Sequence, residues 1–395
     1  MNRLKRTLSV ALSALTVLSA ATAFSATYCA DEVETESSAV TVNGIEIGTK
    51  QDDGSILLNV SSDPAQNGRV INAALNDNKK RTIVIPPKKF KIERVIWLGN
   101  NKTINAKGAT IFQTDPQKPL INHACTKTNY NSLKNITING GTWQVKDNAK
   151  AIRPTSTIRF NHAQNITIKN ARIDTNYVSH AVELIACKNV TFDKCKLEAK
   201  GKQKNDKYAE PLQIDIATKA TAPTIASYGK KYVSGQVCKN ITVKNCVVTG
   251  SRGICTNKTD TENGKWLKKY HSNVKIIGCT VTGMATEALC LHNVMGVTVK
   301  NTKAYSKGKD DNYNVGCYLA GMGNNKSTSK HKNLFSSNTF KGGRYGLYIA
   351  TYSGNKFGKT TVKNNKLYAK NGASAALKVL GGTKVVSKGN KKYKW

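Results

Sequence analysis

The segment Lys239-Asn-Ile-Thr-Val-Lys-Asn-Cys246 is one copy of a pattern that recurs along most of the chain. Each copy is short, rich in Ile, Val and Thr, alternates apolar with polar residues, and ends in Asn or Gly. These features are typical of a strand followed by a turn. The copies have a base period in the low twenties with insertions of variable length, which does not fit helical repeats. They begin at Lys134, Gln164, Lys188, Lys239, Ser272, Met295 and Lys332, with a degenerate copy at Thr361–Asn365.

A second strand precedes each copy, and its apolar positions, such as Val182/Leu184 and Leu212/Ile214, are expected to face inward. Stacked parallel coils of such strands form a solenoid. We therefore predict an all-β fold, a right-handed parallel β-helix, with a short capping helix within 70–78 that covers the first coil. Strands are expected at 82–87 and 104–112.

The Asn-Ile-Thr-Ile repeats, together with the helix followed by Ile83-Val-Ile-Pro86, make the chain similar to the pectate-lyase-like superfamily of β-helix proteins. The resemblance covers roughly residues 66 to 380. It implies the architecture but no particular activity, because the superfamily includes polysaccharide lyases, glycoside hydrolases, epimerases and adhesins. The sequence lacks the catalytic motifs of polygalacturonases, pectate lyases and alginate epimerases. No catalytic residue is therefore carried over.

Four regions are expected along the chain. Residues 1–30 combine Arg3, Lys5 and Arg6 with a short apolar run and small residues, which indicates a secretory signal peptide. An acidic segment (31–65), the β-helix (66–380) and a basic tail (381–395) follow. We expect a monomer, exported or bound to the cell wall, without a membrane span.

The charge of the chain points to an anionic partner. Lys and Arg number 61 against 24 Asp and Glu, a formal net charge of +37. Because the excess is spread along the chain, a polyanion is the natural partner, although excess Lys could serve solubility alone. Export favours acidic polysaccharide or a cell-wall polyanion. A nucleic acid is not expected, since the sequence contains no recognisable binding module.

Aligning the second strands predicts three outward ladders of side chains that converge on one patch. The candidate catalytic residues in this patch are Glu183, Glu210, Asp215 and His180, because clustered carboxylates shift each other's pKa values as acid/base chemistry requires. The candidate substrate-binding residues in and around it are Arg159, Gln213, Arg252, Trp266, His271, Glu287 and His292.

Several chemistries remain open for this patch. In a hydrolase, one carboxyl would protonate the glycosidic oxygen and another would activate water, with Arg159 and Arg252 holding an acidic sugar. In a lyase, His180 or His271 would remove the proton next to a uronate carboxylate while a cation neutralises the enolate. Ca²⁺ is a possible cofactor, although few oxygen ligands can be named, and no other cofactor is expected. The alternative is that the residues of the patch are ordinary solvent-facing ladder residues without a catalytic role, with Glu210 and Arg252 forming an ion pair between neighbouring coils.

Insertions in the same coils are expected to wall a groove beside the patch, and their aromatic residues suit stacking on sugars. The insertions are 200–208, 217–237, 257–271 and 303–314, and they carry Tyr208, Tyr228, Tyr232, Trp266 and Tyr270.

The cysteines fall into columns. We expect Cys195, Cys246 and Cys279 to form an inward thiol stack that fills small spaces, and Cys187 and Cys238 to form another column. Cys255 and Cys290 are placed outward, within disulfide range of each other.

Two functions of different classes follow. The leading hypothesis is a secreted enzyme, a lyase or glycoside hydrolase, that cleaves or modifies an acidic polysaccharide in a groove on the β-helix face. The alternative is a non-catalytic cell-surface or cell-wall β-helix protein that binds a polyanion.

Overall fold

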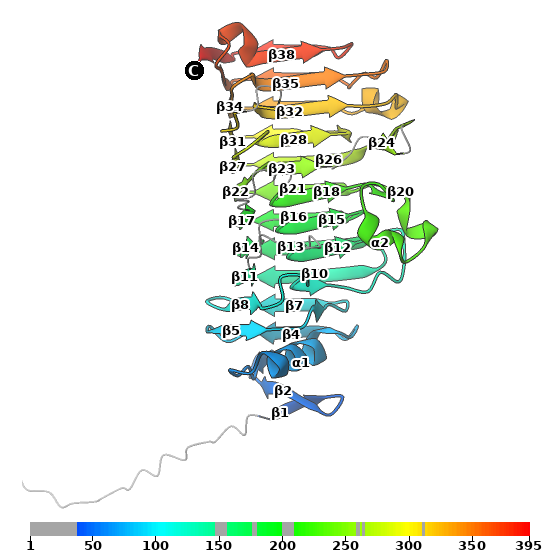
Figure 1. The fold of residues 1–395 in the computed structure, drawn as a ribbon, viewed down its shortest axis with the longest axis vertical. Coiled ribbons are helices and arrows are strands. Elements are labelled where there is room, and N and C mark those ends of the chain that lie inside the picture. The colour runs from blue at the N-terminus through cyan, green and yellow to red at the C-terminus, as the bar shows by residue number, and fades with distance from the viewer. Residues whose placement is uncertain are drawn as a thin grey trace, which may run out of the picture. The chain divides into compact units, whose positions relative to one another are not determined.

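Three long sheets wind around one interior in the computed structural model of the chain. It describes residues 38–146, 156–175, 180–199, 209–257, 261–262, 265–309 and 313–395. The predicted signal peptide lies outside these residues. Successive coils stack along one axis, each contributing one strand to each sheet (Figure 1). The predicted parallel β-helix is therefore confirmed.

Sheet A contains the repeat pattern, sheet C contains the second strands, and sheet B completes each coil. The strands of sheet A are β1 (Ala39–Val42), β2 (Ile45–Lys50), β3 (Ile56–Leu58), β4 (Arg81–Val84), β7 (Lys102–Asn105), β10 (Leu133–Asn139), β13 (Ala163–Lys169), β16 (Lys188–Asp193), β21 (Lys239–Lys244), β26 (His271–Ile277), β29 (Val294–Met295), β30 (Thr298–Lys300), β33 (Asn333–Ser336), β36 (Thr360–Lys363) and β39 (Val385–Lys388).

The strands of sheet B are β5 (Lys89–Ile92), β8 (Thr110–Gln113), β11 (Thr142–Val145), β14 (Arg172–Asp174), β17 (Lys196–Ala199), β22 (Val247–Gly250), β27 (Thr280–Gly283), β31 (Lys303–Ser306), β34 (Thr339–Gly342), β37 (Lys366–Ala369) and β40 (Lys391–Lys394). Those of sheet C are β6 (Ile96–Trp97), β9 (Ile121–Asn122), β12 (Ile158–Asn161), β15 (Val182–Ile185), β18 (Leu212–Asp215), β23 (Ile254–Thr256), β28 (Leu289–His292), β32 (Val315–Gly321), β35 (Tyr345–Thr351) and β38 (Leu377–Leu380).

The first coil is capped by helix α1 (Pro64–Leu75). It begins six residues before the predicted helix because Asp63 caps it, its side chain accepting the Ala65 N–H at 2.8 Å, and Pro64 occupies the first turn. Val70, Ile71, Ala74 and Leu75 bury the inner face of the helix in the core. The strand expected at 104–112 is two strands, β7 and β8.

The two ends of the chain also join the sheets. Within the predicted acidic segment, β1, β2 and β3 extend sheet A antiparallel to one another. Within the predicted basic tail, β39 and β40 form part of the last coil. Sheet A therefore extends beyond residues 66–380 on both sides, with antiparallel strands at the N-terminal end and a further parallel coil at the C-terminal end.

The first Asn of each repeat copy lies within its sheet A strand but interrupts the regular strand conformation with a one-residue turn. Asn135, Asn165, Asn189, Asn240 and Asn273 have φ between 55° and 59°, the left-handed region that Asn tolerates better than most residues. Each donates a side-chain hydrogen bond to the Asn of the preceding coil at 2.8–3.1 Å, beginning with Asn135 to Asn101. The pattern thus encodes a turn and a ladder together.

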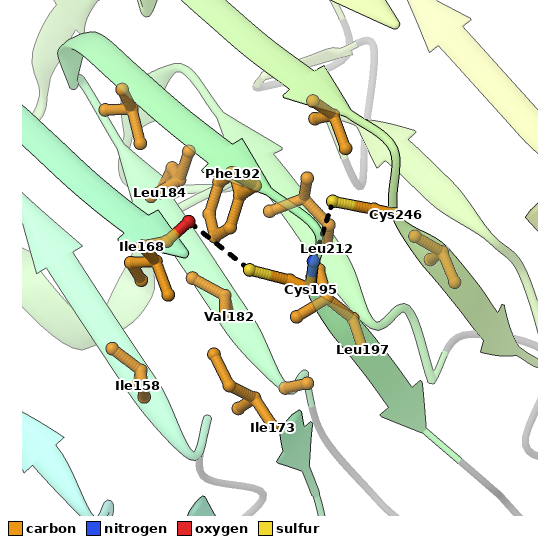
Figure 2. Close-up of a cluster of buried hydrophobic side chains, with 14 of the residues drawn as sticks. Ile158, Ile168, Ile173, Val182, Leu184, Phe192, Cys195, Leu197, Leu212 and Cys246 are labelled. Atoms are coloured by element: carbon orange, nitrogen blue, oxygen red, sulfur yellow. Dashed lines mark hydrogen bonds between the residues drawn. The ribbon is translucent and has the colours of Figure 1, made fainter. Parts of the chain in front are cut away.

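Cys195, Cys246 and Cys279 form the expected inward column, and they also act as hydrogen-bond acceptors. The Cys195 backbone N–H donates to Cys246 Sγ at 3.3 Å (Figure 2). The Cys246 N–H donates in the same way to Cys279 Sγ at 3.5 Å. In the following coils the hydroxyl of Thr302 and the amide oxygens of Asn338 and Asn365 accept the equivalent N–H groups. The column therefore satisfies buried backbone donors as well as filling space.

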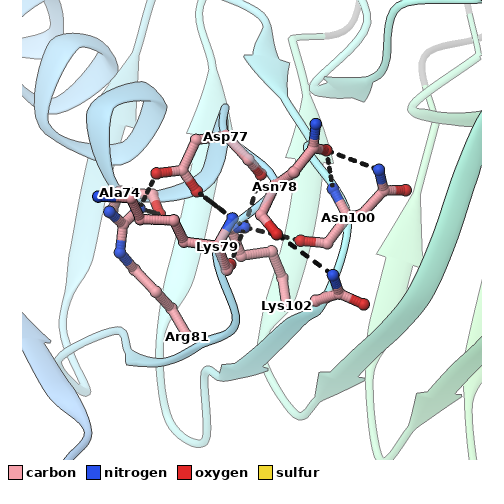
Figure 3. A network of polar contacts seen from close by, with 8 residues as sticks. Ala74, Asp77, Asn78, Lys79, Arg81, Asn100 and Lys102 are labelled. Carbon is pink, nitrogen blue, oxygen red and sulfur yellow. Dashed lines mark hydrogen bonds and ion pairs between the residues drawn. The ribbon is translucent and has the colours of Figure 1, made fainter.

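Lys102 occupies an inward position opposite Ile136 and is buried near the cap. Its Nζ donates to the carbonyls of Asp77, Lys79 and Asn100 at 2.6–2.8 Å and lies 3.1 Å from Asp77 Oδ1 (Figure 3). Burial lowers the pKa of Lys102, although Asp77 opposes this shift. All three ammonium protons have acceptors, so the group joins the cap to the first coils.

Short elements project from the coils in the insertions. Helices α2 (Pro223–Ala226) and η1 (Lys230–Val233), with the strand pair β19 (Ala217–Thr218) and β20 (Ser234–Gln236), lie beside sheet C. Ile225 and Tyr232 pack there against the outward-facing Ile185. Strands β24 (Thr261–Glu262) and β25 (Lys265–Trp266) form another pair, and η2 (Lys326–Lys330) and η3 (Ala373–Ala376) follow. The expected insertion at 303–314 is partly strand β31.

Candidate functional site on sheet C

The predicted register of the outward ladders is confirmed. Arg159 pairs with Glu183, Glu183 with Gln213, Gln213 with Cys255, and Cys255 with Cys290 across successive strands of sheet C. These side chains are nevertheless buried rather than solvent-facing. The alternation of the strands identifies the outer side of the sheet, but it does not reveal what covers that side.

Glu183 is held by two donors. Arg159 Nε and Ser156 Oγ each donate to Glu183 Oε2 at 2.6 Å. Burial alone would raise the pKa of Glu183, but the charges of Arg159 and His180 and these hydrogen bonds outweigh burial and lower it. Glu183 is therefore ionised at neutral pH.

His180, Glu210, Arg252 and Glu287 form a chain of ion pairs across four successive coils. His180 Nδ1 lies 3.2 Å from Glu210 Oε2, Arg252 Nη1 lies 3.2 Å from Glu210 Oε1, and Arg252 Nε lies 3.0 Å from Glu287 Oε2. Burial alone would lower the pKa of His180, but Glu210, with smaller contributions from Glu183 and Asp215, raises it overall. The Glu210–Arg252 pair anticipated as the structural alternative is present.

Exposure separates these residues. The His180 side chain is 17% exposed, whereas that of Glu210 is completely buried. His180 is thus the predicted catalytic residue best placed to meet a ligand, and Glu210 acts on it from beneath.

Gln213 and Asp215 lie deeper, on the next strand. Gln213 Nε2 donates to Asp215 Oδ1 at 2.8 Å. Within the described part of the chain, Gln213 Oε1 and the Asn161 Oδ1 on strand β12 are buried acceptors without a hydrogen-bond donor. Such atoms are rare in folded proteins, and each could accept a hydrogen bond from a water or a ligand hydroxyl.

His271 does not contact the patch surface. Its Nδ1 accepts the Cys238 N–H at 2.9 Å, and its Nε2 contacts Asn257 Oδ1 at 2.7 Å. Burial lowers the pKa of His271 to about 3, so the ring is neutral. It continues the inward column in which the Cys187 N–H donates to Cys238 Sγ at 3.1 Å, and its role is structural. The position of His271 immediately before the Ser272 copy, equivalent to Cys238 before the Lys239 copy, was the signal in the sequence.

The other residues predicted to contact a substrate differ in where they lie. His292 lies edge-on to Tyr318, with ring centroids 5.0 Å apart, and so belongs to the sheet C surface. Tyr232 and Tyr270 are buried, whereas Tyr228 is 45% exposed. Trp266 lies in β25, but its side chain, like all of Tyr208, is outside the described residues.

A tyrosine cluster outside the predicted site continues the ladder beyond Cys290. Tyr318 and Tyr348 stack with centroids 4.7 Å apart, and both hydroxyls contact Tyr352 Oη, at 3.0 and 3.3 Å. The equivalence of Tyr318 and Tyr348 in the strand alignment was sufficient to find this stack.

Cys255 and Cys290, which the strand alignment places within disulfide range of each other, are not bridged. All nine described cysteines, including Cys255 and Cys290, are free and buried. Arg252 lies beside this pair, with Nη1 3.8 Å from Cys255 Sγ.

The structure gives no support for a calcium site. No group of three or more His, Cys, Asp or Glu side chains within the described ranges is arranged to hold a metal. Glu183 and Glu210 instead face Arg and His partners. None of the described helices is long and apolar enough to cross a membrane.

Charge is unevenly distributed along the axis. Residues 313–395 contain 16 Lys and Arg and no Asp or Glu. The expectation of an even spread therefore holds for the cations but not for the acids. The C-terminal coils are purely cationic, whereas the coils of the patch contain ion-paired carboxylates.

No family model and no curated protein sequence matches this chain. Several solved structures are similar to it. The surface adhesin PfbA of Streptococcus pneumoniae aligns with 84% of this chain and 90% of its own, at 15% identity and a TM-score of 0.50. The endo-xylogalacturonan hydrolase from Aspergillus tubingensis aligns with 85% of this chain and 91% of its own, at 12% identity and a TM-score of 0.51. One is an adhesin and the other a hydrolase, so the likeness concerns architecture. The chain has the right-handed parallel β-helix fold that these two structures share.

Proposed function

We propose that the protein is exported and binds an acidic extracellular polysaccharide. The observation that carries this proposal is the purely cationic composition of residues 313–395, which build the last coils of the β-helix. Cations in a stretch of sequence that contains no Asp or Glu attract polyanions over several ångströms, and they release counterions on binding. Glu183, Glu210 and Glu287 of the patch, in contrast, already face Arg or His partners.

Retention on immobilised polygalacturonate, compared with a neutral dextran matrix, tests this function. We expect retention on the acidic matrix alone, with elution as salt rises, because screening weakens exposed charge contacts. Equal retention on dextran, or none on either matrix, would contradict the proposal.

Cleavage of the same polymer is the second candidate function, and the environment of His180 favours it. His180 has a raised pKa and remains partly exposed, while neighbouring Glu183 is ionised. In a hydrolase, His180 would protonate the glycosidic oxygen and Glu183 would activate water. In a lyase, neutral His180 would remove the proton next to the uronate carboxylate, with Arg159 compensating the developing charge.

Product analysis separates cleavage from binding alone. Incubation with polygalacturonate would be followed by reducing ends, for hydrolysis, and by absorbance of unsaturated sugars, for elimination. His180→Gln is expected to abolish either product while retention on the polymer stays unchanged. Product formation at the original rate in this variant would remove His180 from the mechanism, and no product from the unaltered protein would leave binding alone.

A further inference from the structure

The outer face of sheet B changes character along the axis. Near the middle coils its charges are paired: Arg172 contacts Asp174 at 3.0 Å and Glu198 at 2.9 Å, and Lys196 contacts Glu198 at 3.0 Å. In the C-terminal coils the same columns contain Lys and Tyr with no acid.

Every one of the last four coils contributes a lysine to this face. Lys303, Lys366 and Lys391 share one column, with Thr339 between the first two, and Lys341 stands in the neighbouring column. Lys303, Lys366 and Lys391 are exposed, and none of the four lysines forms an ion pair with a described residue. A chain lying along the axis would therefore meet a cation at each step of about 4.8 Å, the spacing between neighbouring strands.

Aromatic residues fix the position of part of this charge. Lys341 Nζ lies 4.9 Å from the ring centroid of Tyr368 and 5.1 Å from that of Trp395. Tyr368 in turn stacks on Tyr393, with centroids 4.7 Å apart. Cation–π contacts of this kind restrict the lysine side chain without neutralising it, so less rotamer entropy is lost when an anion binds.

We infer that Lys303, Lys341, Lys366, Lys391, Tyr368 and Tyr393, here called the lysine–tyrosine stripe, form a binding site for an acidic polysaccharide chain. This inference rests on the proposed function and assigns it to one face. Carboxylate groups of the polymer pair with the ammonium groups, and its hydroxyl groups reach the tyrosine hydroxyls.

The ring arrangement favours a polysaccharide over a nucleic acid. Single-stranded nucleic acids gain affinity by stacking bases on free aromatic faces. In the stripe, Tyr368 is covered by Tyr393 and Lys341, and Trp395 lies under Lys341 and Lys370. These contacts engage the Tyr368 and Trp395 rings with partners from the protein itself, although Trp395 remains 44% exposed.

The test compares two triple variants of the full chain that lose the same charge from opposite ends of sheet B. One is Lys341→Gln/Lys366→Gln/Lys391→Gln. The control is Lys89→Gln/Lys91→Gln/Lys107→Gln, which removes exposed lysines on or beside strand β5. Binding to polygalacturonate of defined length would be measured across a salt series, with single-stranded DNA of equal charge as the competing ligand.

We expect the stripe variant to bind about tenfold more weakly at 0.1 M salt and its salt dependence to become shallower, because three ionic contacts are lost. The control variant should stay within about twofold, since only general attraction is reduced. Equal losses in both variants would overturn the stripe as a site while leaving polysaccharide binding intact. Tighter binding of DNA than of polygalacturonate would overturn the choice of ligand, and no binding of polygalacturonate would overturn the proposed function itself.

Lysine labelling of the unaltered protein provides a readout that does not depend on how the variants fold. With polygalacturonate bound, acetylation of Lys303, Lys366 and Lys391 should slow, while that of Lys89 and Lys91 should not. Uniform protection of both sets would contradict the inference.

Discussion

At the scale of single residues, Glu210 controls the protonation of His180. We expect Glu210→Gln to lower the pKa of His180, because the variant removes the buried carboxylate that counteracts desolvation. An NMR titration of the imidazole measures this. Glu198→Gln, which alters another largely buried carboxylate on sheet B, is the matched control and should leave His180 unchanged. An unaltered His180 titration in Glu210→Gln would show that Glu210 does not set its pKa.

His180 and Glu183 make the stability of the fold depend on pH, with one contribution lost at high pH and the other at low pH. Because the folded pKa of His180 is raised, its contribution is complete below the unfolded pKa of about 6.5 and is lost as pH rises through the folded value. Because the pKa of Glu183 is lowered, its contribution is present above the unfolded value of about 4.3 and is lost as pH falls through the folded value. The free energy of unfolding should be measured with denaturant at several pH values. As pH rises above neutrality, it should fall less in His180→Gln than in the unaltered protein. A parallel loss in both proteins would contradict this assignment.

At the scale of elements, the asparagine turn has two separable contributions. Asn189→Ala loses the ladder bonds to Asn165 and Asn240 and places a β-carbon in the left-handed region, so we expect a cost of about 2 kcal/mol. Asn189→Gly loses the same bonds but tolerates the backbone, and about half that cost is expected. Urea unfolding of both variants measures the difference. Equal costs would mean that the positive φ contributes nothing.

The inward columns give a second prediction at this scale. His271→Ala leaves the Cys238 N–H without its acceptor, and a loss of about 1–3 kcal/mol is expected. His271→Asn supplies an amide oxygen, as Asn338 and Asn365 do in other coils, and should recover part of the loss. Urea unfolding again gives the comparison. Neither variant should alter polysaccharide binding, and a specific binding defect in a stable His271→Asn protein would restore His271 as a contact residue.

Strand positions and register follow from the sequence because alternation of apolar residues fixes which side of each strand is buried. That regularity correctly placed Gln213 between Glu183 and Cys255. It could not show that the outer side of sheet C is itself covered, because burial there depends on contacts beyond the strand. The start of α1 was missed although Asp63-Pro64 is a typical N-terminal signal. His271 was predicted to be a substrate-binding residue because of its imidazole. Its position in the column of Cys187 and Cys238 places it in the interior.

At the scale of the whole molecule, like charges repel within the C-terminal coils. We expect the melting temperature to rise as NaCl increases from about 0.02 to 0.3 M, because screening relieves this repulsion. Polygalacturonate at low salt should have a larger effect, since a ligand that binds only the folded state stabilises it. Thermal unfolding monitored by circular dichroism measures both. A melting temperature that falls with salt would mean that the ion pairs of the patch outweigh the cationic coils.

The column that runs from Cys195 to Asn390 has a direction. In each described step the backbone N–H of one coil is accepted by a side chain of the coil that follows it in the sequence. During synthesis the N-terminal part emerges first. Each newly made coil therefore keeps one backbone N–H without its acceptor until the following coil has been made. If the coils stack from the capped N-terminal end, the hydrogen bonds of each coil are therefore complete only after the next coil has been synthesised.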